Sequence, residues 1–277
     1  LSSRHQILIF YFQFLRLLLI LLYLPILMDY IICIPSYERA TICNQKTLTT
    51  LHNNNINPEL IYVYVANEIE FDIYLNFVDK KFYNKIIVGV PGLAQQRQFI
   101  MDQFPENKQI IFMDDDVEFI DLSFTNYLNL ENFFQNAFQT CIFQKSFIWG
   151  VYPVFNPFFR KPRKEITTHL TYIVGAMYGI INRPNLQSIK LNITLDTSQK
   201  EDIERSIKYF IEDGIVVRFN KIGFKTKYYG KTGGLGTFKN RLEPMKQACI
   251  KLNEIYSDYG KIKIRSSGMH EFVLKKL

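Results

Sequence analysis

The 277-residue sequence has few of the residues that mark disulfide-stapled, zinc-binding or low-complexity proteins. Its four cysteines (Cys33, Cys43, Cys141 and Cys249) are far apart and form no CxxC pair, so they indicate neither a zinc site nor a disulfide framework and favour a reducing compartment. The 13 glycines and 10 prolines form no repeat, and 48% of the residues are hydrophobic. Collagen-like and disordered chains are therefore excluded. The stretch Gly230-Lys231-Thr232 lacks a glycine at position 225, where the Walker order G-x-x-x-x-G-K-S/T requires one, which excludes a P-loop NTPase.

Charge and length set the broad class of the protein. The net charge of +7 fits a polyanionic partner, such as nucleic acid or a nucleotide-linked substrate, without specifying one. A chain of this length forms one large domain or two small ones. No linker is long enough to require a second domain, so a single domain is expected over residues 29–277.

Residues 1–28 are set apart from this domain by their composition. The stretch 7–28 is almost all apolar and is long enough to span a membrane. Gln13 and Arg16 interrupt it, and an arginine is energetically unfavourable at the centre of a bilayer. One interpretation is a membrane anchor. The other is an upstream extension of a protein that starts at Met28, the first Met, directly before an expected strand. No polar stem separates the apolar stretch from the domain, which favours the extension and a cytoplasmic or nuclear location over membrane anchoring.

Apolar, β-branched strands alternate with helical segments through the first half of the chain. This order predicts βαβ units and a mostly parallel sheet with helices on both faces, an α/β fold. The second half predicts a mixed extension that ends in a basic, Gly-rich loop at 221–239, a helix and a short strand. Strands are expected at 30–34, 60–66, 86–90, 109–113, 146–151, 172–181, 215–220 and 261–264, and helices at 41–52, 68–80, 93–104, 130–143, 198–213 and 243–258.

Three consecutive carboxylates, Asp114, Asp115 and Asp116, directly follow the apolar strand Ile110–Met113. In an extended chain, Asp114 and Asp116 would point the same way and could hold a hard divalent cation that also touches a diphosphate. The carboxyl end of a strand is where open α/β sheets bind ligands. The alternative is a solvated acidic turn. The position after a buried strand favours a site for Mn²⁺ or Mg²⁺.

The chain at this point resembles the GT-A class of nucleotide-sugar glycosyltransferases, in which a DxD motif follows a strand and a divalent metal bridges to the donor diphosphate. Further segments occur in the matching order: Ile34–Arg39 for the nucleotide loop, Val65–Glu68 at the end of the second strand, and Gly92–Arg97 before the DxD strand. The resemblance implies a Rossmann-like GT-A fold. The donor-binding residues that it implies are Pro35, Ser36, Tyr37, Arg39, Ala66, Arg97, Asp114, Asp115, Lys231, Gly233 and Gly234.

More specifically, residues 29–236 resemble the TET-associated glycosyltransferases of phages, large viruses and some protists, the group that contains the base J glucosyltransferase. The segments that carry this resemblance are IPSYERA, GLAQQRQFI, FMDDDV, EDIERSIKYF with GIVVRFN, and KYYGKTGGLG. The group is associated with sugar transfer to 5-hydroxymethylpyrimidines in DNA. The resemblance therefore implies a UDP-sugar donor, a hydroxymethylated DNA acceptor and inversion at the anomeric carbon.

The resemblance also implies that the acidic pair Glu201 and Asp202 supplies the catalytic base, with Asp202 as the favoured residue. Acidic residues in a first helical turn are also favoured by the helix dipole alone. His270 is a candidate third metal ligand, ahead of His169. The arginines and Ser36 have ordinary alternatives as surface and capping residues, and the basic run 160–164 could contact a DNA backbone or be a solvated loop.

The sequence therefore predicts a metal-dependent hexosyltransferase, with glucose as the expected sugar. Three alternatives stay open: the same chemistry on a glycan, protein or lipid acceptor; a catalytically inactive nucleic-acid-binding module; and a metal-dependent nuclease or phosphotransferase. A true membrane anchor at 7–28 would favour the first alternative, and salt-sensitive DNA binding would favour DNA as the substrate.

Overall fold

The structure is a computed structural model that describes residues 30–192, 194, 199–226 and 237–277, without the side chain of Phe238. The apolar leader at 1–28 lies outside this part of the chain, as do the loop residues Lys231, Gly233 and Gly234, so their expected roles stay predictions. Across the described ranges, no helix combines the length and the apolar character needed to cross a membrane.

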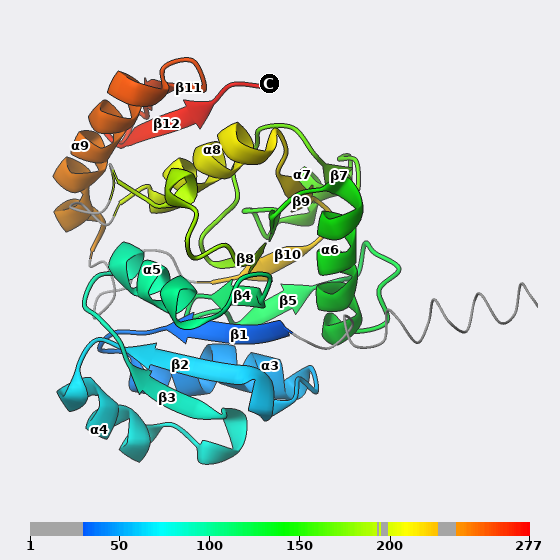
Figure 1. Cartoon of the computed structure of the whole chain (residues 1–277), viewed down its shortest axis with the longest axis vertical. Coiled ribbons are helices and arrows are strands. Elements are labelled where there is room, and N and C mark those ends of the chain that lie inside the picture. Colours follow the sequence, from blue (N-terminus) through cyan, green and yellow to red (C-terminus); the bar gives the residue numbers. More distant parts are fainter. Residues whose placement is uncertain (1–29, 193, 195–198, 227–236) are drawn as a thin grey trace, which may run out of the picture. The chain divides into compact units, whose positions relative to one another are not determined.

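An eight-stranded sheet forms the centre of the fold, in the order β3-β2-β1-β4-β8-β6-β9-β7 (Figure 1). The strands β1, β2 and β3 are parallel, and β9 is parallel to β6. The strand β8 runs antiparallel to both β4 and β6, and β7 runs antiparallel to β9. The expected α/β fold with a mixed second half is thus confirmed. The strands are β1 (Tyr30–Pro35), β2 (Ile61–Val65), β3 (Lys85–Val88), β4 (Gln109–Met113), β6 (Ile148–Val151), β7 (Ile166–Thr167), β8 (Met177–Ile181) and β9 (Val217–Phe219).

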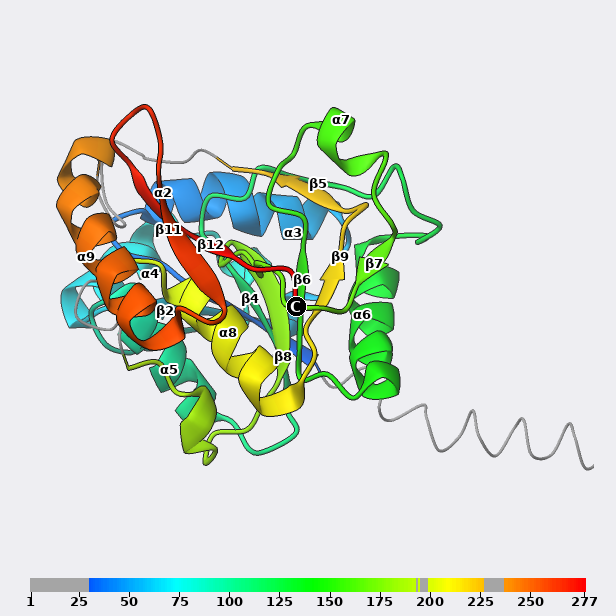
Figure 2. The ribbon, with the colours of Figure 1, turned by 90° about the horizontal axis from the view of Figure 1, so that it is seen from above.

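Helices cover both faces of this sheet, with α2 and α3 on one side of the central strands and α5 and α8 on the other (Figure 2). Asparagine side chains begin two of the helices: Asn67 accepts from the N–H of Glu70, and Asn129 from that of Asn132. Gly214, at φ +71°, ends α8. The helices are α2 (Ala40–Cys43), a π-helical turn (Asn44–Leu48), α3 (Thr49–Asn53), α4 (Glu68–Phe77), α5 (Leu93–Gln103), α6 (Leu130–Gln144), α7 (Pro157–Arg160), α8 (Glu201–Asp213) and α9 (Phe238–Tyr256), with 3₁₀ turns at Pro58–Leu60, Lys80–Phe82 and Gln187–Ile189.

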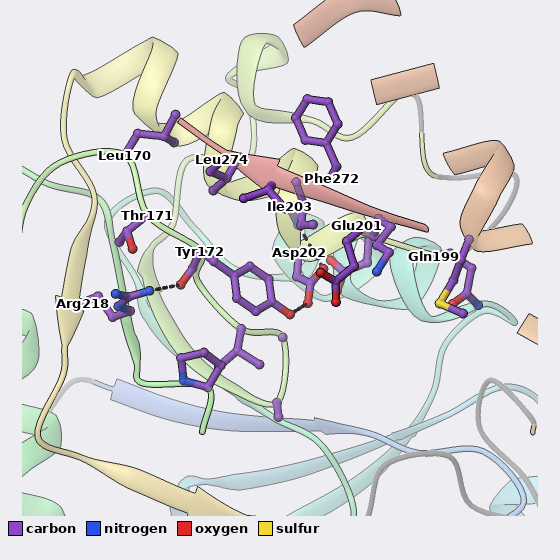
Figure 3. Close-up of a pocket in the computed structure, with 18 of the residues that line it drawn as sticks. Leu170, Thr171, Tyr172, Gln199, Glu201, Asp202, Ile203, Arg218, Phe272 and Leu274 are labelled. Atoms are coloured by element: carbon purple, nitrogen blue, oxygen red, sulfur yellow. Dashed lines mark hydrogen bonds between the residues drawn. The ribbon is translucent and has the colours of Figure 1, made fainter. Parts of the chain in front are cut away.

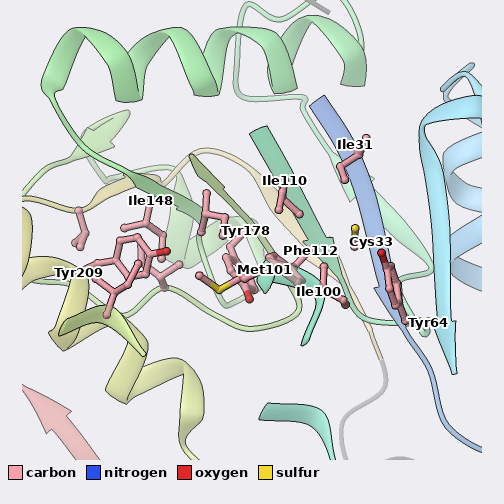
Figure 4. Packing of buried hydrophobic residues seen from close by; sticks show 14 residues of the cluster. Ile31, Cys33, Tyr64, Ile100, Met101, Ile110, Phe112, Ile148, Tyr178 and Tyr209 are labelled. Carbon is pink, nitrogen blue, oxygen red and sulfur yellow. The ribbon is translucent and has the colours of Figure 1, made fainter. Parts of the chain in front are cut away.

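Two apolar clusters fix β4 and β8 beside each other. On one face, the rings of Phe112 and Tyr178 stack at 4.9 Å and pack with residues of α5 and α8, including Tyr209 (Figure 4). On the other face, the buried ring of Trp149 packs edge-on against Phe133 of α6. Because both faces are filled, the ends of β4 and β8 are held at a fixed separation, and Asp114 N–H donates to the carbonyl oxygen of Ala176 at 3.0 Å.

The strand expected at 172–181 is shorter in the structure and begins at Met177. The preceding residues leave the sheet because Ile173 N–H donates instead to Ser206 Oγ on α8, at 3.0 Å. Gly175 follows at a point where α5 and α8 approach the backbone closely. A Cβ atom there would lie 2.8 Å from Nη1 of Arg97, so any other residue would force the Arg97 guanidinium to shift.

The three-residue strands β5 (Phe119–Asp121) and β10 (Gly223–Lys225) were not predicted from the sequence. The stretch 221–239, expected as a loop, contains β10, which pairs antiparallel with β5. Three residues are too few to show a strand period, and here the pairing comes from tertiary contact. The final helix, α9, begins at Phe238, five residues before the expected start. It carries Pro244 within it.

A hairpin of β11 (Gly260–Ile264) and β12 (His270–Leu274) follows α9. Only its first strand was expected. An apolar cluster that includes Ile203 of α8, Leu252 of α9 and Phe272 of β12 joins the three elements. The hairpin is therefore held against α8, next to the acidic residues at the start of that helix.

Candidate active site

The three carboxylates after β4 point to different partners. The chain turns after Asp114 instead of continuing as a strand, so the extended-chain argument for Asp114 and Asp116 does not apply. Asp114 accepts from Nη2 of Arg97 at 2.7 Å. Asp115 is buried and accepts from Ser36 Oγ at 2.5 Å. Asp116 accepts from the hydroxyl of Thr226. Each aspartate thus has its own hydrogen-bond donor.

Arg39, which follows β1, is shared by two of these carboxylates. Its Nη1 lies 3.2 Å from Asp115 Oδ1 and 3.4 Å from Asp116 Oδ2. Burial raises the pKa of Asp115 to about 7, although Arg39 and Ser36 act against this change and the neighbouring aspartates add to it. Burial also raises the pKa of Asp114, against the effect of Arg97. The turn is therefore short of positive charge.

This charge balance suits a divalent cation in part. Carboxylate oxygens are the ligands that Mg²⁺ and Mn²⁺ accept, and a cation would relieve the repulsion within the turn. Among the residues that the structure describes, however, no group of three or more His, Cys, Asp or Glu side chains is arranged to hold a metal ion. Asp114 and Asp116 therefore stay predicted metal ligands.

The other expected donor-binding residues lie at the carboxyl ends of β1 and β2. Pro35 ends β1, and the hydroxyl of buried Ser36 lies 2.6 Å from that of Tyr74 on α4. The side chain of Tyr37 is 43% exposed, whereas Ala66 is buried directly after β2. These residues lie at the edge of a parallel sheet where α/β proteins bind ligands.

Arg97 connects the acidic turn with the acidic pair on α8. Its side chain is only 3% exposed. Nη2 donates to Asp114 and also to the carbonyl oxygen of Gly175, at 2.8 Å, while Nη1 forms an ion pair with Glu201. The second carboxylate oxygen of Glu201 pairs with Arg205. One guanidinium therefore holds together two acidic segments that are far apart in the sequence.

Asp202 lies beside Glu201 in the first turn of α8 and has no arginine partner among the described residues. Its Oδ2 accepts from the hydroxyl of Tyr172, and its Oδ1 from the N–H of Ile203 at 3.0 Å (Figure 3). Sequence analysis did not identify Tyr172, because it lies in a stretch that was expected to be a strand and belongs to no motif. The tyrosine fixes the direction of the Asp202 carboxylate.

One cavity of about 720 Å³ is lined by Arg97, Asp114, Tyr172, Glu201 and Asp202. The other described residues that were expected to bind the donor or the metal do not line it: Pro35, Ser36, Tyr37, Arg39, Ala66, Asp115 and Asp116. Tyr172 lies between Arg218 and Asp202, and the hairpin strand β12 closes one side of the cavity (Figure 3). His270 lies on β12 outside the lining, with Nδ1 3.2 Å from the carbonyl oxygen of Gly268. Its neighbour Glu271 does line the cavity. The role of His270 as a metal ligand stays a prediction.

The basic run 160–164 does not form one solvated surface. Arg160 is fully buried, forms an ion pair with Asp121 and donates at 2.7 Å to the carbonyl oxygen of Lys221. The hypothesis that the whole run contacts DNA is therefore wrong for Arg160, because this guanidinium holds α7 against β5 and β10.

No protein-family model matches the chain, and no curated protein matches it. Solved structures do. A crystal structure of residues 1–349 of TarS from S. aureus is 14% identical, with a TM-score of 0.45, over 82% of this chain and 66% of that one. GalNAc-T7 with UDP, GalNAc and Mn²⁺ is 11% identical, with a TM-score of 0.48, over 79% and 48%.

Glucosyl-3-phosphoglycerate synthase from Mycobacterium tuberculosis, solved with Mn²⁺, UDP-glucose and phosphoglyceric acid, is 11% identical, with a TM-score of 0.46, over 90% of this chain and 88% of that one. The chain thus spans about two thirds of the TarS fragment and about half of GalNAc-T7. All three TM-scores are below 0.5, so the likeness alone does not identify the activity of this chain.

Proposed function

We propose that the chain is a metal-dependent glycosyltransferase that moves a sugar, with glucose as the favoured one, from a UDP-sugar to the hydroxyl of a 5-hydroxymethylpyrimidine in DNA. One observation carries the proposal: Asp114, at the end of β4, and Asp202, at the start of α8, line the same cavity and are connected through Arg97 and Glu201. Sugar transfer requires a group that engages the donor diphosphate and a base, and the candidates for these two roles, Asp114 and Asp202, both line this cavity.

Asp202 is the proposed general base. It would take the proton from the acceptor hydroxyl while that oxygen attacks the anomeric carbon and the bond to UDP breaks on the opposite face, which inverts the anomeric configuration. Tyr172 holds the carboxylate in position. Both oxygens of Glu201 are engaged by arginines, so we assign Glu201 the task of positioning Arg97.

A divalent cation at Asp114 and Asp116 would, when bound, neutralise charge that develops on the leaving diphosphate. The chain's own residues at the turn have a separate task. Arg39 and Ser36 hold Asp115 in a buried position, which fixes the turn and leaves the carboxylate of Asp114, which is 34% exposed, in the lining of the cavity. Arg97 fixes the direction of that carboxylate.

The DNA acceptor rests on the sequence motifs and on the chain's net positive charge. A base within duplex DNA would have to leave the stack to reach a cavity of about 720 Å³. This requirement predicts that single-stranded or mispaired hydroxymethylated DNA reacts faster than a perfect duplex.

The test uses the chain with Mn²⁺, a panel of UDP-sugars, and matched DNAs that contain or lack 5-hydroxymethylpyrimidines, followed by mass spectrometry of the nucleosides. We expect a hexose mass gain only on hydroxymethylated DNA, formed at least about a hundredfold more slowly with the Asp202→Asn variant. The Asp258→Asn variant, which changes an exposed carboxylate outside the cavity, is the matched control.

The other outcomes separate the alternatives. UDP release with glycan, protein or lipid acceptors, but not with DNA, would keep the chemistry and replace the acceptor. Cleavage of DNA without a donor would indicate a nuclease. DNA binding without UDP binding or transfer would indicate a binding module and overturn the proposal.

A further inference from the structure

The end of the cavity beyond Tyr172 is lined by cations. Arg218 of β9, His169 and Lys276 all line it, and Arg218 is drawn beside Tyr172 in Figure 3. No ion pair between described residues involves Arg218 or His169. Three positively charged or protonatable groups thus share one end of the cavity without a carboxylate in ion-pair contact with Arg218 or His169.

Backbone contacts bring these three residues together from distant parts of the chain. Arg218 lies opposite Thr167 in the β7–β9 pairing, two residues before His169. Leu170, the next residue, donates its N–H to the carbonyl oxygen of Leu277 at 3.3 Å, which places Lys276 beside His169. The cluster is therefore held by the sheet and by the segment that follows β12, and does not depend on flexible side chains alone.

The guanidinium of Arg218 has unused hydrogen-bonding capacity. Nε donates to Asn220 at 2.8 Å and Nη1 to the carbonyl oxygen of Tyr172 at 3.2 Å. An arginine has five N–H donors. Among the described residues, its three others have no acceptor. His169 likewise has no hydrogen-bond partner within the described part of the chain.

The charges in this cluster repel one another. Burial, together with the charge of Arg163, lowers the pKa of Arg218 to about 10, against the effect of Tyr152. Burial, followed by the charges of Lys276 and Arg218, lowers the pKa of His169 from its ordinary value. A bound anion would remove this repulsion and accept the unused hydrogen bonds.

We propose that Arg218, His169 and Lys276 form an anion subsite within the acceptor pocket, and that the acceptor carries a phosphate group which binds there. The inference rests on the proposed function, because it assigns part of the acceptor to the same cavity. Tyr172 sets the spacing: its carbonyl oxygen contacts Arg218 and its hydroxyl contacts Asp202. The phosphate and the reacting hydroxyl of the acceptor should therefore lie about one tyrosine length apart.

The first experiment tests the subsite without measuring catalysis. The chain has four histidines, so the NMR resonances of His169 can be assigned by comparison with the His169→Gln variant. Inorganic phosphate is titrated into the chain at a series of pH values. We expect phosphate to raise the pKa of His169, and we expect the increase to be lost with Arg218→Gln and reduced with Lys276→Gln.

Matched variants keep this test interpretable. Lys276 is exposed, so its replacement should leave the fold intact even if Arg218→Gln unfolds. Arg218→Lys should retain part of the response because it keeps the charge. Lys85→Gln, on an exposed strand position outside the cavity, should behave as the unmodified chain. An unchanged pKa of His169 with phosphate in the unmodified chain would overturn the subsite.

The second experiment connects the subsite to the acceptor. Transfer is measured with 5-hydroxymethyldeoxycytidine and with its 5′-monophosphate, which differ only in the phosphate. We expect a KM at least about tenfold lower for the phosphorylated acceptor, as for a charge-assisted hydrogen bond, and we expect Arg218→Gln to remove the difference.

The two proposals fail in different ways. Equal KM values for both acceptors, or a preference that Arg218→Gln and Lys276→Gln leave unchanged, would overturn the phosphate-bearing acceptor while leaving the glycosyltransferase in place. Absence of transfer and of UDP binding, together with a phosphate response at His169, would contradict the proposed function and leave the anion subsite standing without its assignment to an acceptor.

Discussion

The two ends of the cavity contain similar residues in opposite electrostatic states. At one end, the lining residue Arg97 is paired with both Glu201 and Asp114, and Arg205, which lies behind the lining, is paired with the second oxygen of Glu201. At the other end, Arg218 has no carboxylate partner among the described residues and burial lowers its pKa. Ion pairs hold their side chains in a fixed geometry, whereas an unpaired buried cation lowers the stability of the fold unless a ligand neutralises it.

This difference separates the residues that position the chemistry from those that bind substrate. Changes at the paired end should lower kcat, because they disturb groups that act on the reacting atoms. Changes at the unpaired end should mainly raise the acceptor KM. Tyr172 contacts both ends, through its hydroxyl and its carbonyl oxygen, and is therefore the residue at which the two effects meet.

The largest effect is expected for Asp202→Asn. The amide keeps the shape of the side chain but cannot take the acceptor proton, so kcat should fall about a hundred- to ten-thousandfold. The binding of UDP, measured by calorimetry, should stay within about twofold. A variant that keeps most of its transfer activity would contradict the role of Asp202 and remove the functional distinction between the two ends.

A smaller effect is expected for Gly175→Ala at the paired end. The new Cβ atom would lie 2.8 Å from Nη1 of Arg97 and 3.1 Å from Oε1 of Glu201, so the ion pair must shift. Unfolding measurements should show a loss of about 1–3 kcal/mol, and transfer should fall about ten- to a hundredfold.

A double-mutant cycle with Glu201→Gln checks the cause of the Gly175→Ala effect. If the ion pair transmits the effect, the two substitutions together should cost less than the sum of their separate effects. Strict additivity would show that Gly175 acts on some other contact and that the Arg97–Glu201 pair does not position the catalytic groups.

Tyr172→Phe should have a modest effect, because it removes one hydrogen bond to Asp202 and leaves the carbonyl contact with Arg218 in place. We expect kcat to fall about two- to tenfold, with the acceptor KM nearly unchanged. Steady-state kinetics distinguish the two parameters. A change confined to KM would place Tyr172 in acceptor binding instead.

The smallest effect concerns the titration of His169. Burial and then the charges of Lys276 and Arg218 lower the pKa of His169 in the folded chain, so folding disfavours the protonated ring. The free energy of unfolding should therefore decrease as the pH falls below about 6.5, the ordinary pKa of histidine. Lys276→Gln should raise the pKa of His169 and weaken this pH dependence. NMR titration measures the change, with Lys85→Gln as the control; no change would show that Lys276 does not act on His169.

The sequence predicted the part of the fold that local pattern determines. The apolar strand expected at 109–113 is present, and the helix expected at 198–213 is observed at Glu201–Asp213. A continuous apolar run between polar segments, and an amphipathic helix followed by a glycine, are both visible in the local sequence. The strands β5, β10 and β12 were not predicted. The first two are only three residues long, and β12 is positioned by packing against α8 and α9.

The sequence identified individual residues of the candidate site but not the contacts between them. The sequence identified Arg97, Asp114 and the Glu201–Asp202 pair separately, but not the ion pairs that join them, since no spacing rule connects segments so far apart. Nor did it identify Tyr172 or the cationic cluster around Arg218, whose members come from three segments that meet only in the folded chain.

The most direct test of the central claim is calorimetric titration of UDP into the chain, with and without Mn²⁺, compared with the Asp114→Asn plus Asp116→Asn variant. The account predicts one UDP bound per chain, an affinity that falls at least about tenfold when Mn²⁺ is removed, and no effect of Mn²⁺ in the double variant. UDP binding that is absent, or that is the same with and without Mn²⁺ in the unmodified chain, would contradict the assignment of this cavity to metal-dependent sugar transfer.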